Sequence, residues 1–146
     1  NGLWPPCLFI MLNPSTADAV QDDPTIRRCT DYAARMLAGG LVVANLFAFR
    51  ATKPEDLKAA KDPVGPKNEE YLISSAVGTM QMGGFVVCAW GTHGEFMGRG
   101  DAVLAELKEA GVKPWALKLT KSGQPGHPLY LPKALFPAPI DELKSV

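Results

Sequence analysis

The sequence lacks the features that mark several large classes of protein. No hydrophobic run approaches the roughly 20 residues that a membrane-spanning helix needs, and no signal-peptide pattern is visible. Cysteine is scarce, because the chain has only Cys7, Cys29 and Cys88, and no two of them are close enough in sequence to resemble a metal-binding pair. We therefore expect reduced, mostly buried thiols in a cytoplasmic protein without a membrane segment.

Signatures of several common chemistries are also missing. The chain has no glycine-rich loop of the Walker or dinucleotide-binding type, no serine in a nucleophile elbow and no pair of carboxylates at an obvious catalytic spacing. Histidine occurs only at His93 and His127, which are far apart in the sequence. A dedicated metal site is therefore not expected, and no cofactor is indicated.

An excess of charge of either sign is absent as well, because 15 Lys and Arg residues balance 15 Asp and Glu residues. Proteins dedicated to nucleic-acid binding are usually basic, so this balance counts against DNA binding while leaving room for a local basic patch. The 146 residues, 47% of them hydrophobic and 21% charged, are sufficient for a soluble globular protein with a real core. We expect residues 1–146 to form a single domain.

Buried hydrophobic runs alternate with helical patterns along the chain. The runs predict strands at residues 7–12, 41–47, 85–90 and 115–119. Helices are expected at about residues 24–37, 53–61, 68–82 and 100–110, the first capped by the Asp22-Asp23 pair before Pro24 and the third capped by Asn68. This alternation predicts an α/β fold with three layers, α/β/α, around a central, mainly parallel sheet of four strands. The proline-rich tail is expected to form a final turn or short helix.

Polar side chains follow each predicted strand, and parallel strands bring their carboxyl ends to one edge of a sheet. These residues are Asn13, Pro14, Ser15, Thr16 and Asp18 after the first strand, Asn45 late in the second, Trp90, Thr92 and His93 after the third, and Lys121 and His127 after the fourth. Their convergence predicts a ligand pocket. Amides and imidazoles in a site without a metal suit the positioning of a water molecule and hydrogen bonding to an oxyanion or a base edge.

Two features of the sequence have two interpretations each. Asn45 lies in an apolar run and must be hydrogen-bonded either to neighbouring backbone or to a ligand. Arg27 and Arg28 lie in the first turn of a predicted helix, where they either form a solvated face or bind a phosphate. Of the two histidines we favour His127 as the functional one, because the proline that follows it fixes the turn.

Six segments resemble, in order, a bacterial and phage family known as domain of unknown function 1643. They are LNPSTAD, DDPTIRRC, ANLFAFRAT, VGP, AWG and GHPLYL, and they extend over nearly the whole chain. A more distant resemblance is to the uracil-DNA glycosylase superfamily. It is carried by Asn13-Pro14 after the first strand, Asn45 late in the second, Val87 to Gly91 in the third, and His127-Pro128-Leu129 after the fourth.

The second resemblance implies a fold similar to uracil-DNA glycosylase and a set of site roles. Asn13 would position the attacking water, Asn45 would recognise the base edge, and His127 would stabilise negative charge on the departing base. Leu129 or Tyr130 would be the wedge that fills the gap left by a flipped base. The chain departs from the superfamily's His-Pro-Ser pattern at Leu129, which stands in place of serine.

Three functions fit these observations. The first is an N-glycosidic hydrolase, similar to a DNA glycosylase, acting on a normal or modified base in DNA. Its candidate phosphate or DNA contacts are Arg27, Arg28, Arg50, Lys53, Lys121 and Leu129. The second is a binding protein or enzyme for a free nucleotide or nucleoside, and the third is a non-catalytic interaction module on the same fold. The first two imply a nucleobase-containing ligand, and the oligomeric state stays open.

Overall fold

The computed structural model describes residues 4–14 and 23–144. Three of the predicted ligand contacts, Ser15, Thr16 and Asp18, lie outside these ranges.

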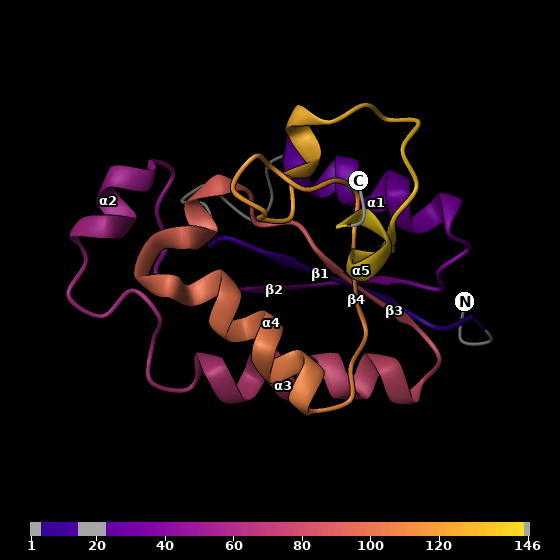
Figure 1. The fold of residues 1–146 in the computed structure, drawn as a ribbon, viewed down its shortest axis with the longest axis horizontal. Helices are drawn as coiled ribbons and strands as arrows, with labels where there is room; N and C mark the ends of the chain where they lie inside the picture. Colours follow the sequence, from indigo (N-terminus) through magenta and orange to yellow (C-terminus); the bar gives the residue numbers. More distant parts are fainter. Residues whose placement is uncertain (1–3, 15–22, 145–146) are drawn as a thin grey trace.

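A five-stranded sheet forms the centre of the molecule (Figure 1). Its strands are β1 (Cys7–Met11), β2 (Leu41–Asn45), β3 (Phe85–Cys88), β4 (Pro114–Ala116) and β5 (Ala138–Pro139), arranged in the order β2-β1-β3-β4-β5. The first four strands are parallel, whereas β5 pairs antiparallel with β4. The predicted α/β class and mainly parallel sheet are therefore confirmed. The predicted count of four strands is wrong, because the proline-rich tail adds a two-residue strand at the edge of the sheet, where proline is tolerated.

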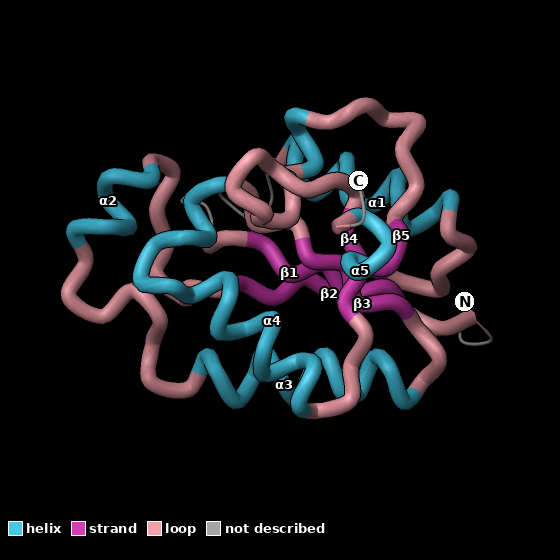
Figure 2. The backbone as a smooth tube through the Cα atoms, viewed as in Figure 1, coloured by secondary structure: helices cyan, strands magenta, loops and turns pink. Residues whose placement is uncertain are grey.

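Helices cover both faces of this sheet (Figure 2). They are α1 (Pro24–Arg35), α2 (Pro54–Ala59), α3 (Asn68–Gln81), α4 (Arg99–Glu109) and α5 (Ile140–Leu143). Helix α1 lies on one face, and α3 and α4 lie on the other. Two further segments contain 3₁₀ turns: Thr92–Gly98, which is kinked at Phe96 and Met97, and Pro128–Tyr130.

The ends of two helices test the predicted caps. Asp23 caps α1, because its Oδ1 accepts the backbone N–H groups of Thr25 at 2.8 Å and Ile26 at 3.4 Å. The capping role predicted for Asn68 is wrong. Asn68 is the first residue of α3, and its Nδ2 donates instead to the backbone oxygens of Asn45 and Leu46 at the end of β2.

The core has two parts, one on each face of β1. Leu8 and Ile10 belong to the cluster shared with α3 and α4, whereas the alternating residues Cys7, Phe9 and Met11 belong to the cluster shared with α1. This is the pattern expected of a strand that is buried on both faces.

All three cysteines are free and buried in this core. Burial raises the pKa of the Cys7 and Cys29 thiols to about 12 and also raises the pKa of Cys88, so these thiols stay protonated and unreactive at neutral pH. None of the helices in the described part of the chain is long and apolar enough to cross a membrane.

Candidate functional site

A cavity of about 1160 Å³ lies at the carboxyl ends of the parallel strands. The ends of β1 and β2, the turn after β3, the segment after β4 and the first half of α1 all contribute to its lining. Small-molecule sites usually measure about 300–1,000 Å³. The cavity is therefore large enough for a whole nucleotide rather than a base alone.

Most of the predicted site residues that the structure describes line this cavity. They are Asn13, Pro14, Arg27, Asn45, Arg50, Trp90, Thr92, His127 and Leu129, together with His93 and Tyr130. Arg28, Lys53 and Lys121 are not among the lining residues. The predicted convergence at one sheet edge thus brings together residues from five segments that are distant in sequence.

Sequence reasoning missed several polar lining residues. Thr25, Thr30 and Asp31 come from α1, Thr52 precedes α2, and Thr120 follows β4. The α1 residues carried one usable signal, because Asp23 and Pro24, which mark the start of this helix, come ten residues after Asn13 in the sequence. A helix that starts at the edge of a sheet presents its first turns to that edge.

The Asn13 side chain is held in one orientation by backbone carbonyl groups. Its Nδ2 donates to the oxygens of Ala51 at 2.9 Å, Phe49 at 3.1 Å and Pro14 at 3.2 Å. Carbonyl groups only accept hydrogen bonds, so the nitrogen of the amide must face them. The oxygen Oδ1 is therefore the atom of Asn13 that can accept a hydrogen bond from a water or a ligand.

Asn45 ends β2, where it is in register with Met11 of β1. Its backbone oxygen accepts from Asn68, but none of the hydrogen bonds recorded for residues 4–14 and 23–144 uses its side chain. The sequence left two possible partners for this amide, neighbouring backbone or a ligand. A backbone partner is not found in the described chain, and the half-buried amide lines the cavity. An amide in this position offers a ligand both a donor and an acceptor.

His127 stands immediately before the 3₁₀ turn Pro128–Tyr130 and has a defined tautomer. Its Nδ1 accepts the backbone N–H of Leu129 at 3.2 Å, which places the ring proton on Nε2. Burial lowers the pKa of His127 below its usual value, and the negative charge of Asp23 acts in the opposite direction. At neutral pH the ring is therefore a neutral hydrogen-bond donor.

The turn that carries His127 packs against Gly91. This glycine has φ 79° and ψ −174°, and a Cβ atom at this position would lie 3.3 Å from the Cβ of His127. Its N–H donates to the oxygen of Pro125 at 2.7 Å. Only glycine adopts this backbone region readily, so Gly91 allows the end of β3 to approach the His127 segment closely.

Trp90 supports the site rather than offering its indole N–H to a ligand. The side chain is only 1% exposed, and its Nε1 donates to Oε1 of the buried Gln124 at 2.8 Å. Gln124 in turn donates from Nε2 to Asp101 at 3.3 Å. This chain of hydrogen bonds connects β3, the segment before His127 and α4, and it holds the loop at residues 120–127 in place.

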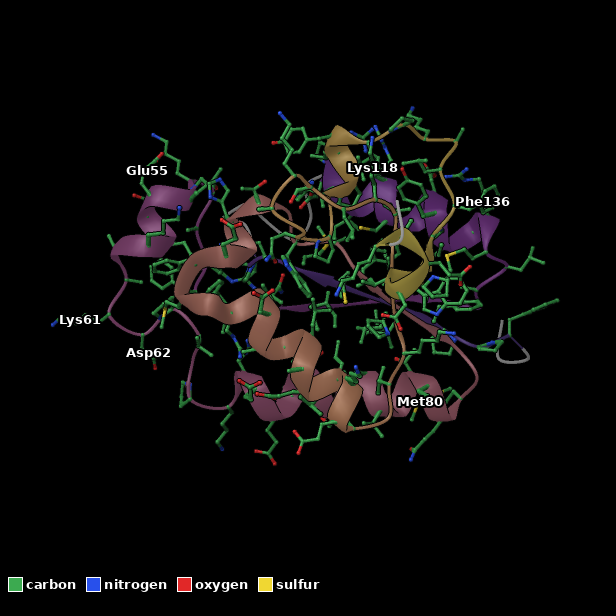
Figure 3. The ribbon with its side chains drawn as sticks, viewed as in Figure 1. Glu55, Lys61, Asp62, Met80, Lys118 and Phe136 are labelled. Atoms are coloured by element: carbon green, nitrogen blue, oxygen red, sulfur yellow. The ribbon has the colours of Figure 1, made fainter. Side chains whose placement is uncertain are left out.

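Helix α1 holds the segment after His127 through a row of side chains, which we call the α1 clamp. Arg28 Nη1 donates to the oxygens of Leu131 at 2.8 Å and Pro128 at 3.1 Å, and Tyr32 Oη donates to Pro132 at 2.7 Å. Arg35 donates to Leu135 at 3.2 Å and lies over the ring of Phe136, the residue labelled in Figure 3. These contacts give Arg28 an anchoring role, and its predicted phosphate contact stays a prediction.

The charges on the described lining are balanced. Asp23 and Asp31 carry negative charge, and Arg27 and Arg50 carry positive charge. Within the ranges that the structure describes, no group of three His, Cys, Asp or Glu side chains could hold a metal ion. The described lining thus offers amides, hydroxyl groups, the imidazoles of His93 and His127, and equal numbers of acidic and basic side chains.

Residues 3–129 match the family model described as "Protein of unknown function (DUF1643)". The chain belongs to this family. The DUF1643 match includes the cavity residues from Met11 to Leu129. A comparison with curated proteins gives no match, and a comparison with solved structures gives none either. Family membership brings no activity with it, so function must be argued from the cavity.

Proposed function

We propose that this protein is an N-glycosidic hydrolase, similar in fold to uracil-DNA glycosylase, which cleaves the bond between a nucleobase and its sugar. The observation that carries the proposal is the state of His127. A neutral imidazole with its proton on Nε2 lines the same cavity as the Asn13 and Asn45 amides. These are the groups that departure of a base requires.

The chemistry assigns a different task to each group. Cleavage leaves positive charge on the sugar and negative charge on the base, so a fixed donor near the base lowers the barrier. His127 Nε2–H supplies that donor. Asn45 offers a donor and an acceptor to the edge of the base, and Oδ1 of Asn13 accepts a hydrogen bond from the attacking water.

Two observations bear on the substrate. Tyr130 lines the cavity and is 84% exposed, which suits stacking on a neighbouring base in DNA. The equal numbers of acidic and basic lining residues favour instead the second candidate function, a binding protein or enzyme for a free nucleotide or nucleoside. Both candidates use the same cavity, and a ligand screen separates them.

The test combines binding and turnover. Nucleosides, mononucleotides and oligonucleotides with normal and modified bases are screened by thermal shift, and released base is measured by mass spectrometry. The matched variant is Asn45→Ala, which removes the side-chain amide without breaking any recorded hydrogen bond. We expect an unfolding free energy within about 0.5 kcal/mol of wild type, as for other changes that disturb no packing or network, and loss of ligand stabilisation.

The outcomes separate the candidate functions. Base release that Asn45→Ala reduces supports hydrolysis, and a steep fall of oligonucleotide affinity with salt supports DNA as the substrate. Stabilisation by a mononucleotide without base release supports the small-molecule binding protein. If no member of the panel stabilises the protein and none releases a base, both candidate functions are contradicted. That result favours a non-catalytic interaction module.

A further inference from the structure

The proposed hydrolysis needs a group that takes a proton from the attacking water. The Asn13 amide orients a water molecule but is not basic enough to accept its proton, and Nδ1 of His127 already accepts the N–H of Leu129. Among the described lining residues, the carboxylates are those of Asp23 and Asp31. His93 also lines the cavity but is exposed, so we look for the base among the carboxylates.

Of these two carboxylates, Asp23 is the one fixed in position. Its Oδ1 accepts two backbone N–H groups at the start of α1, from Thr25 and Ile26, and the residue is half-buried. Both hydrogen bonds use Oδ1, and no hydrogen bond between Oδ2 and another residue of the described ranges is found, so we assign Oδ2 to the water molecule. Asp31 lies two turns further along α1 and is exposed.

Asp23 also acts on the histidine of the site. Its negative charge works against the effect of burial on the pKa of His127. Asp23, at the start of α1, and His127, in the segment after β4, both line the cavity.

We infer that Asp23 is a catalytic residue, the general base of the hydrolysis. This inference rests on the proposed function. The oxygen of water bonds to the anomeric carbon of the sugar, while the bond from that carbon to the base nitrogen breaks and its electron pair leaves with the base. One proton of the water moves to Oδ2 of Asp23, and the solvent later protonates the departed base. The carboxylate also faces the positive charge that develops on the sugar.

The N-cap role of Asp23 permits a clean test, because serine and asparagine cap helices about as well as aspartate. Asp23→Ser and Asp23→Asn therefore keep the start of α1 and remove the carboxylate. We expect unchanged Tm, retained ligand binding and a fall in kcat of about 10²–10⁴-fold, with loss of the acidic limb of the pH profile. Asp23→Ala removes the cap as well and should lower Tm. Glu55→Gln, in the first turn of α2, is the matched charge-removal control and should leave kcat unchanged (Figure 3).

The results distinguish this inference from the proposed function. Wild-type kcat in Asp23→Ser overturns the assignment of the base but leaves the hydrolase proposal intact. Loss of kcat in Asp31→Asn or Asp18→Asn, with activity kept in Asp23→Ser, also overturns it by placing the base elsewhere. Absence of base release by the wild-type protein, over the whole substrate panel, overturns both.

Discussion

Replacement of Arg28 by lysine separates an anchoring role from a phosphate-binding role. The guanidinium group of Arg28 donates to two backbone oxygens, those of Pro128 and Leu131, which flank the turn after His127. Both hydrogen bonds come from the same atom, Nη1 at the end of the guanidinium group. Lysine keeps the positive charge, but its side chain is shorter and ends in a compact ammonium group, so it does not place a nitrogen at the position of Nη1. If Arg28 is an anchor, Arg28→Lys therefore loosens the turn even though the net charge is unchanged.

The expected size of this effect follows from the contacts. Because Arg28 is half-buried, water can replace part of the hydrogen bonding that the two backbone oxygens lose. We therefore expect the unfolding free energy of the variant to fall by about 1–2 kcal/mol. For a chain of 146 residues this corresponds to a fall in Tm of about 3–8 °C. The looser turn should also lower the rate of base release, because small misplacements of a catalytic group are costly.

Thermal unfolding and steady-state kinetics provide the assay. Arg35→Lys is the matched control, because Arg35 donates to the same segment at Leu135, on the far side from His127. We expect this control to lower Tm by a smaller amount and to leave kcat unchanged. The reasoning is refuted if Arg28→Lys keeps the wild-type Tm and kcat but raises KM for a phosphate-bearing ligand. That result would restore the phosphate contact.

Three further predictions concern positions around the site. Gly91→Ala should lower the unfolding free energy by about 1–3 kcal/mol and displace His127, because alanine would be forced into a backbone region that only glycine adopts readily. Thermal unfolding and activity assays measure the two effects. Asn13→Ala should cost roughly 1–3 kcal/mol in a urea titration, because backbone carbonyl groups lose their donor. Interaction with the carboxyl group of Glu69, with smaller contributions from burial and negative charge, raises the pKa of Glu106 to about 7. Since the folded protein then binds more protons than the unfolded chain between about pH 4.5 and 7, its stability falls as pH rises through this range. Glu106→Gln, which stays neutral, should therefore have a higher Tm than wild type at pH 8 and a similar Tm at pH 5.

Controls and contrary outcomes for these predictions are direct. Gly98→Asn is the matched control for Gly91→Ala, because Gly98 has φ 63°, a region that asparagine tolerates, and open space around it. Equal destabilisation in both variants would contradict the argument for Gly91. An unchanged urea midpoint in Asn13→Ala, or a Tm difference for Glu106→Gln that is the same at both pH values, would contradict the other two.

Elements whose structure depends on local sequence were predictable. The central strand β1 is an uncharged run that any sheet must bury, and Asp23 before Pro24 is a strong local signal for a helix start. The convergence of Asn13, Asn45 and His127 also followed from the parallel arrangement of the strands, because parallel strands end at one edge. The ends of the strands were less certain, since hydrophobicity continues past the last paired residue of β2.

Features that depend on distant partners could not be predicted. Arg28 is a solvated or phosphate-binding residue by every local criterion, and its acceptors are 100 and 103 residues away. The same reason explains Asn68, which has the composition of a cap but reaches the end of β2. It also explains Trp90, whose partner Gln124 lies 34 residues further along the chain. In each case the side chain alone indicates what it can bind, and only the fold shows which group it meets.

The most direct test of the central claim compares wild type with His127→Asn in a base-release assay by mass spectrometry. Asparagine can cap the turn and accept the N–H of Leu129, but it lacks the imidazole Nε2–H that we assign to the departing base. We predict base release by the wild-type protein and a rate about 10²–10³-fold lower in the variant, with ligand stabilisation retained. Equal rates in the two proteins, or no released base from any substrate, would contradict the claim that this cavity breaks an N-glycosidic bond.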